Sequence, residues 1–150
     1  MPARWLTAAL AALLLGPVVD ARADIPVVEL DGVVHAVTAA HVVQAIDRAD
    51  ADGAPLLVIR IDTPGGLDSS MRQIVDRMLN CRTPVAVFVG PSGARAASAG
   101  FVIAVAADVA AMAPGTNIGA AHPVGAGGQE IGGTMSEKVV NDMVAQAKSV

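Results

Sequence analysis

Aromatic residues and cysteine are scarce in this chain of 150 residues, which has one Trp, two Phe, no Tyr and one Cys. The chain has few rings to stack on bases, a mild formal charge of −4 and no basic patch, so we expect it not to bind nucleic acid. The lone Cys81 cannot close an internal disulfide, and one Cys with three scattered His argues against a zinc site. Neither a Walker A sequence nor a dinucleotide fingerprint is present, so we expect no metal and no cofactor.

Long apolar runs are also rare, and the one that occurs lies at the N-terminus. Residues 6–15 are apolar except for one Thr, follow a short basic start and precede the small-residue sequence at 21–23. This three-part pattern predicts a secretory signal peptide over residues 1–23, cleaved after Ala23, with an uncleaved signal anchor as the alternative. No later run reaches the roughly 18 apolar residues of a membrane helix. We therefore expect an exported protein.

What the chain does have is a regular alternation of strand and helix patterns. Strands are predicted over 25–30, 56–61, 84–89 and 109–113, and helices over 38–51, 68–80, 96–107 and 136–150. Thr38 is the expected N-cap of the first helix, and Asp68 or Ser69 that of the second. The near-continuous apolar run at 56–61 predicts a strand covered on both faces. Residues 114–134 are expected to be irregular.

This alternation predicts an α/β fold with a mostly parallel sheet, in which sites form at the carboxyl ends of the strands. The last predicted helix reaches Val150 without a Gly, Pro or cap. We therefore expect residues 24–150 to be one domain that is incomplete at its C-terminus.

Ser98 is the first candidate for chemistry, because it follows a strand and a Gly-rich turn at the start of a predicted helix. Small neighbours would let a substrate backbone approach, and the N–H of Ala99 would point to where an oxyanion forms. A Ser tolerated in a small-residue helix is the alternative. Gly65 and Gly66, which follow Pro64 at the end of another strand, could present a second oxyanion donor, or form an ordinary type II turn.

A nucleophilic serine needs a base, and the residues themselves leave two candidates open. Lys138 lies in the first turn of the last predicted helix and could serve if burial lowers its pKa. His122 lies in the loop before it and could belong to a Ser-His-Asp arrangement. Either could instead be an ordinary surface residue.

Three blocks of sequence around these residues resemble a known family. The blocks are residues 62–67 (DTPGGL), 93–100 (GARAASAG) and 112–120 (MAPGTNIGA), together with Lys138 in its helix. From about Ile25 onward, the chain is similar to the membrane-bound serine proteases of the NfeD family, relatives of the Clp protease proteolytic subunit and of signal peptide peptidase A. The serine block and the Ala-Pro-Gly-Thr block are the more specific matches.

The resemblance implies a Clp protease/crotonase-like fold of repeated ββα units. It implies a serine endopeptidase with a Ser98–Lys138 dyad and oxyanion donors at the backbones of Gly66 and Ala99. It further implies homo-oligomers, substrates among hydrophobic segments of stomatin-like membrane proteins, and a position on the extracytoplasmic side of a bacterial membrane, with the anchor in the missing C-terminal part.

Two other readings stay open beside this one. The Clp proteolytic subunit uses a Ser-His-Asp triad whose histidine lies in a loop much like that of His122, although no Asp for such a triad can be located here. A non-catalytic scaffold, or a crotonase-like protein that binds an acyl thioester in the same oxyanion hole, would not need a nucleophilic Ser98.

Overall fold

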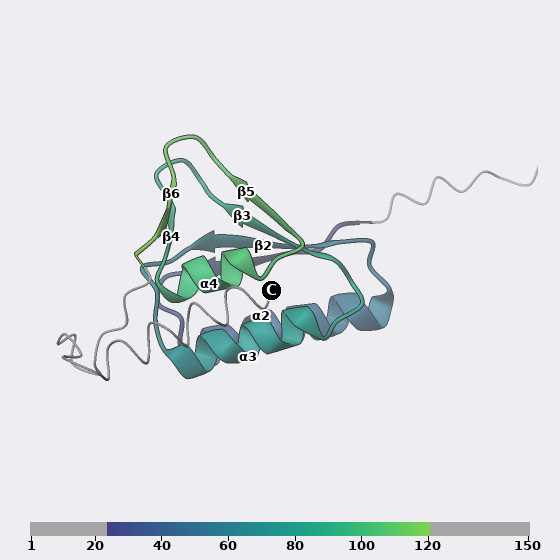
Figure 1. The fold of residues 1–150 in the computed structure, drawn as a ribbon. Helices are drawn as coiled ribbons and strands as arrows, with labels where there is room; N and C mark the ends of the chain where they lie inside the picture. The colour runs from purple at the N-terminus through teal and green to yellow at the C-terminus, as the bar shows by residue number, and fades with distance from the viewer. Residues whose placement is uncertain (1–23, 121–150) are drawn as a thin grey trace, which may run out of the picture.

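The computed structural model describes residues 24–120, which form an α/β domain built on a parallel sheet (Figure 1). Its elements in chain order are β1 (Val27–Asp31), α2 (Ala36–Asp52), β2 (Leu57–Asp62), α3 (Asp68–Leu79), β3 (Val85–Val89), β4 (Arg95–Ala97), α4 (Ala99–Val105), β5 (Val109–Met112) and β6 (Asn117–Gly119). Four strands pair in the order β1-β2-β3-β5, and all three pairings are parallel. A second, two-stranded parallel sheet pairs β4 with β6. The predicted α/β class and mostly parallel sheet are confirmed.

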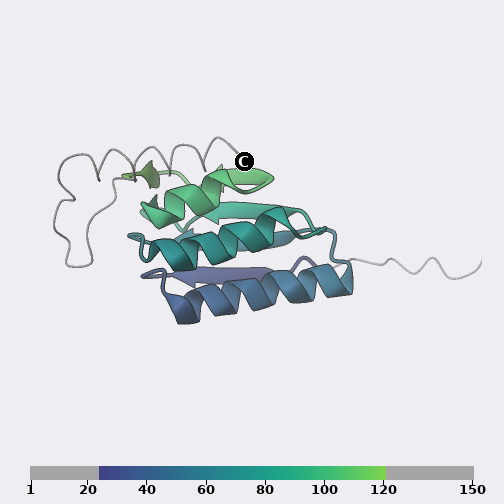
Figure 2. The same cartoon turned by 60° about the horizontal axis from the view of Figure 1, so that its bottom comes forward.

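The hydrophobic core lies between the large sheet and the helices, which line up along it (Figure 2). In β2 the side chains of Leu57, Ile59 and Ile61 are fully buried, whereas the residues between them are only half-buried. The prediction that this strand is covered on both faces was therefore wrong among the described residues. On the less buried face, Arg60 Nη2 lies 2.7 Å from Glu29 Oε1 of the neighbouring strand, which explains how a charged residue is accommodated in an apolar run.

The helix starts differ from the expected ones. The N-cap of α2 is His35, whose Nδ1 accepts a hydrogen bond from the Val37 N–H at 3.2 Å. Thr38 is instead the third helical residue, and its hydroxyl accepts from the His35 N–H at 2.9 Å. The N-cap of α3 is Leu67, which makes no side-chain cap. Asp68 lies in the first turn of that helix, where its charge complements the helix dipole.

The largest departure from the prediction concerns β4 and β6. Residues 96–98 were expected to be helical, but α4 begins only at Ala99 and β4 precedes it. Residues 117–119, expected to be irregular, form the partner strand β6. A short run of small residues favours a helix locally, and only its pairing with a segment about twenty residues later makes it a strand.

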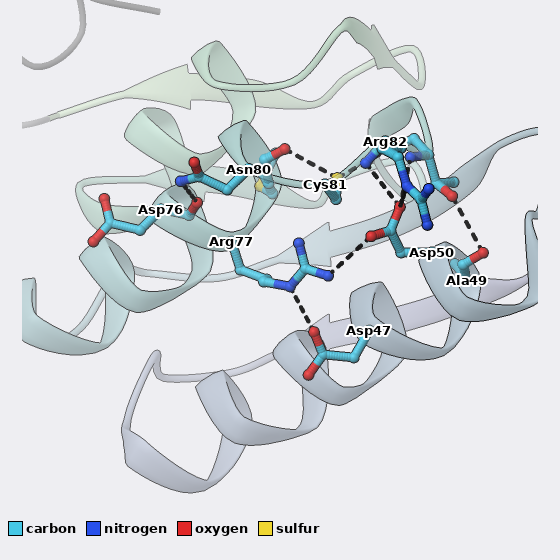
Figure 3. A network of polar contacts seen from close by, with 10 residues as sticks. Asp47, Ala49, Asp50, Asp76, Arg77, Asn80, Cys81 and Arg82 are labelled. Carbon is cyan, nitrogen blue, oxygen red and sulfur yellow. Dashed lines mark hydrogen bonds and ion pairs between the residues drawn. The ribbon is translucent and has the colours of Figure 1, made fainter.

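A polar network lies at the amino ends of the strands of the large sheet (Figure 3). The Asp50 carboxylate accepts hydrogen bonds from the Arg82 N–H at 2.7 Å, the Thr83 N–H at 3.1 Å and Arg77 Nη2 at 3.2 Å. Arg77 also pairs with Asp47. The network therefore ties the last turns of α2 and α3 to the loop that enters β3.

Several predictions fall outside the described residues: the signal peptide over 1–23, the helix over 136–150, His122 and Lys138. Within residues 24–120, none of the helices has the length and apolar character needed to cross a membrane.

Candidate active site

Ser98 occupies a sharp turn between β4 and α4. Its backbone has φ 53° and ψ −115°, a conformation that residues with a side chain rarely adopt. Such strain costs on the order of 1–3 kcal/mol and persists only where the surrounding structure enforces it, most often at functional sites. The side chain is half-buried at the N-cap position of α4 but makes no capping hydrogen bond there. The Ser98 hydroxyl is therefore not used to cap the start of the helix.

The two-stranded sheet enforces this turn. The Ser98 N–H donates to the carbonyl of Gly119 at 2.8 Å, directly after the register pair formed by Ala97 and Gly119. The Ser98 carbonyl in turn accepts from the N–H of Phe101 at 3.0 Å. Both backbone groups of Ser98 are thus engaged, so the strained conformation is fixed by β6 on one side and by α4 on the other.

Gly65 lies directly against Ser98, although it is far away in sequence. A Cβ built on Gly65 would lie 2.6 Å from the Cβ and 3.2 Å from the Oγ of Ser98. Gly65 also has φ +112°, which disfavours any side chain. A glycine is therefore required at this position both by the backbone conformation and by the close approach of Ser98.

Two backbone N–H groups near Ser98 have no hydrogen-bond partner among the described residues. One belongs to Ala99, the first residue of α4, where helix geometry leaves the N–H unpaired. The other belongs to Gly66, whose neighbours Gly65 and Leu67 both bond to Val34 while its own N–H does not. Unpaired donors beside a half-buried hydroxyl are the parts that acyl transfer requires.

The Ser98 turn is packed closely onto the end of β2. A Cβ on Gly100 would lie 2.4 Å from Cγ2 of the fully buried Thr63, so α4 can approach only because this position is glycine. Thr63 also exchanges backbone hydrogen bonds with β4, donating to Arg95 at 2.7 Å and accepting from Ala97 at 3.1 Å.

The structure places Ser98, Gly66 and Ala99, the three described candidates, at one edge of the domain, and it shows the strain at Ser98. It does not describe Lys138 or His122. Sequence reasoning missed Thr63 and the role of Gly65 as the residue that contacts Ser98. The signal available was the polar pair Asp62-Thr63 directly before Pro-Gly-Gly. Within the part of the chain that the structure describes, no group of three His, Cys, Asp or Glu residues is placed to hold a metal ion.

The parallel sheet, its row of helices and the strand–serine–helix turn define a Clp-protease-like α/β domain. The sequence profile of the NfeD1b N-terminal domain matches residues 24–150, and the chain belongs to this family. It is 35% identical over 150 residues to the membrane-bound protease PH1510 of Pyrococcus horikoshii, a match that covers 98% of this chain and 34% of that protein. It is 33% identical over 111 residues to the membrane protein NfeD1b of Bacillus subtilis, covering 72% of this chain and 25% of that protein.

Solved structures of 1510-N, a membrane-bound stomatin-specific protease, share this fold. A lysine-to-alanine variant in complex with a substrate peptide superposes with a TM-score of 0.76 at 34% identity, covering 86% of this chain and 59% of that one. A serine-to-alanine variant gives a TM-score of 0.74 at 36% identity, with 83% and 61% covered. The chain spans about a third or less of the curated relatives it matches. The Clp-like fold expected from the resemblance is confirmed.

Proposed function

We propose that this chain belongs to a serine endopeptidase in which Ser98 is the nucleophile. The observation that carries the proposal is the strained Ser98 turn, which lies against Gly65 and is flanked by the N–H groups of Gly66 and Ala99, neither of which has a partner among residues 24–120. An ordinary packing serine would gain nothing from this conformation. A nucleophile gains a side chain presented outward at a helix start, with donors for the developing negative charge beside it.

In the proposed reaction, Ser98 Oγ attacks a peptide carbonyl while neutral Lys138 accepts its proton. The Gly66 and Ala99 N–H groups stabilise the tetrahedral oxyanion. Collapse breaks the C–N bond, the amine leaves with the proton returned by the lysine, and an acyl-enzyme remains. Water then attacks the ester and gives a proton to the lysine; as the C–O bond to Ser98 breaks, the lysine passes that proton to Ser98 Oγ, which releases the acid and restores neutral Lys138.

The family position supports Lys138 over His122 as the base. The serine-to-alanine and lysine-to-alanine variants chosen for the 1510-N structures also fit a serine and a lysine as the working pair. A Ser-His-Asp arrangement with His122 is the competing form of the same reaction, and single substitutions separate the two.

For the substrate we propose an apolar segment of a stomatin-like membrane protein, cut on the extracytoplasmic side of the membrane by an assembly of several copies. The 1510-N relative is named for its stomatin specificity, and both curated relatives are described as membrane proteins. The surface beside Ser98 suits an apolar peptide, since Leu67 is 57% exposed next to Gly66 and Ile118 is 39% exposed next to Gly119.

The test measures cleavage of a peptide that copies an apolar segment of a stomatin-like protein by the full-length protein. We expect Ser98→Ala and Lys138→Ala each to abolish cleavage, and His122→Ala to retain it. Ser69→Ala, an exposed serine in the first turn of α3, is the matched control and should behave as wild type. Cleavage that survives Ser98→Ala contradicts the proposal, and loss of cleavage in His122→Ala with retention in Lys138→Ala reassigns the base.

A fluorophosphonate probe separates an enzyme from the two non-proteolytic readings. We expect a covalent adduct on Ser98. A scaffold, or a protein that only binds acyl thioesters, would give no adduct at this residue.

A further inference from the structure

Thr63, at the end of β2, is fully buried although it is polar. Its hydroxyl accepts a hydrogen bond from the Gly65 N–H at 3.0 Å and donates one to the Gly65 carbonyl at 3.2 Å. One side chain therefore engages both backbone groups of the glycine that lies against Ser98. Buried hydroxyls are expected to find partners, but closing both bonds on a single residue fixes that residue's orientation as well.

The Gly65 carbonyl oxygen has a second donor, the Val34 N–H, at 2.9 Å. In a trans peptide the carbonyl and the following N–H lie in one plane and point in opposite directions. The N–H that follows the Gly65 carbonyl is that of Gly66, the proposed oxyanion donor. Hydrogen bonds to the Gly65 oxygen therefore decide where the Gly66 N–H points. Val34 holds the oxygen from one side and the Thr63 hydroxyl from another.

We propose that Thr63 is a positioning residue that locks the Gly65–Gly66 peptide so that the Gly66 N–H faces the oxyanion. The inference rests on the proposed function, since it assigns a role in that site. Two adjoining glycines offer little steric resistance to rotation of the peptide between them. Without the hydroxyl, the Gly65 carbonyl would keep a single hydrogen bond from the described residues, the one from Val34, and the Gly66 N–H would face the oxyanion for less of the time.

Thr63 also fixes the donor relative to the nucleophile. Its backbone is bonded to both Arg95 and Ala97 of β4, the strand that leads into Ser98. The same residue thus holds the donor peptide through its side chain and the nucleophile strand through its main chain. A shift of Thr63 would move both partners of the site together, which keeps their spacing.

The two ends of the Thr63 side chain have separable functions. The hydroxyl bonds to Gly65, whereas the methyl group packs over Gly100. Valine keeps the methyl and the shape but loses the hydroxyl. Serine keeps the hydroxyl but loses the methyl. The pair therefore separates peptide positioning from packing.

The experiment measures kcat and KM for the apolar peptide with full-length wild type, Thr63→Val and Thr63→Ser. Because the donor is misaimed and not removed, we expect kcat of Thr63→Val to fall about 10- to 100-fold, below the roughly 10²- to 10³-fold cost of deleting an oxyanion donor. KM should change less than about 3-fold, since the bond matters mainly for the transition state. Thr63→Ser should keep kcat within about 3-fold of wild type.

Thr63→Ala and Thr63→Ser form a second pair, in which both variants lack the methyl group and differ only in the hydroxyl. This pair gives the answer even if Thr63→Val fails to fold, and we expect the serine variant to be the faster. Equal kcat values in that pair, or a folded Thr63→Val with wild-type kcat, overturn the inference. If Ser98→Ala is inactive at the same time, the proposed function stands while the inference fails. Cleavage by Ser98→Ala overturns the proposed function itself.

Discussion

The polar groups at the two ends of the sheet differ in how fully they are hydrogen-bonded. At the amino ends of the strands, the Asp50 carboxylate is 14% exposed and accepts three hydrogen bonds, two from backbone N–H groups and one from Arg77. At the carboxyl ends, Ser98 is held in a strained conformation, and the N–H groups of Gly66 and Ala99 find no partner among residues 24–120. The Asp50 carboxylate is satisfied at one end, whereas two N–H groups at the other end have no partner among the described residues.

The difference shows how the domain separates stability from chemistry. Satisfied groups such as those around Asp50 join α2, α3 and the start of β3. Open donors and backbone strain at Ser98 cost stability, and they are retained where a substrate atom could use them. Variants at the two ends should therefore have different signatures, with loss of activity at the Ser98 end and loss of stability without loss of activity at the Asp50 end.

The largest effect is expected from Gly65→Ala. The new Cβ would lie 2.6 Å from that of Ser98 and would stand at φ +112°, so we expect peptide cleavage to fall by more than ~100-fold as the turn or the Gly66 donor is displaced. Steady-state cleavage and fluorophosphonate labelling both report this loss.

The matched control is Gly53→Ala at the C-cap of α2, near the opposite end. Gly53 has φ +63° with nothing within 4 Å of a Cβ, so the variant should lose about 1–2 kcal/mol of stability and keep its activity. Wild-type cleavage by Gly65→Ala would break the contrast between the two ends.

The second largest effect is expected from Asp50, and it concerns the free energy of unfolding alone. The hydrogen bond from the Arg82 backbone N–H, aided by those from Arg77 and Thr83, holds the pKa of Asp50 below its ordinary value of 3.8. A carboxyl with a lowered folded-state pKa stabilises the fold fully above its unfolded pKa, and that stability is lost as pH falls through the folded value.

We therefore expect Asp50→Asn to lower the free energy of unfolding at neutral pH and to leave Ser98 labelling unchanged. The difference from wild type should shrink as pH falls below about 3.8, as followed by denaturant unfolding. Asp52→Asn, an exposed neighbour in the same helix end, should show neither effect. An equal gap at pH 7 and pH 2.5 would show that the charge of Asp50 is not what stabilises this end.

The smallest effect is a change in stability expected when the strain at Ser98 is removed. Ser98→Gly removes the strain of a side chain at φ 53°, so we expect an inactive protein that is about 1 kcal/mol more stable than wild type. Ser98→Ala, which keeps a Cβ at the same φ, should be inactive without the gain. Denaturant unfolding of both variants measures the difference, and a Ser98→Gly variant less stable than Ser98→Ala would contradict the strain.

Much of the frame was predictable because its signals are local. The apolar alternation and the Gly and Pro breaks placed four strands and three helices of the described region close to where they lie. The exact helix starts were harder to predict, since His35 and Leu67 take the N-cap positions although Thr38 and Asp68 suit such positions better by residue type. A cap depends on backbone angles as well as on the side chain.

The site was predictable only in part. Ser98, Gly66 and Ala99 follow from small residues at strand ends, and the structure brings them together. The contact of Gly65 with Ser98 could not be predicted, because it joins segments that meet only when the end of β2 lies beside β4. The two hydrogen bonds between the Thr63 hydroxyl and Gly65 are local, but they depend on the backbone angles of the Pro-Gly-Gly turn, which residue types alone do not give.

By itself, the sequence determined the α/β class, the order of the main elements and the identity of the candidate nucleophile, because periodicity and turn residues act over a few positions along the chain. The tertiary structure decided that residues 95–97 form a strand, that Ser98 is strained, and that Gly65 lies against Ser98. The strand at 95–97 and the turn at Ser98 depend on hydrogen bonds between residues about twenty to thirty positions apart, and a local pattern carries no record of which distant segment will supply the partner.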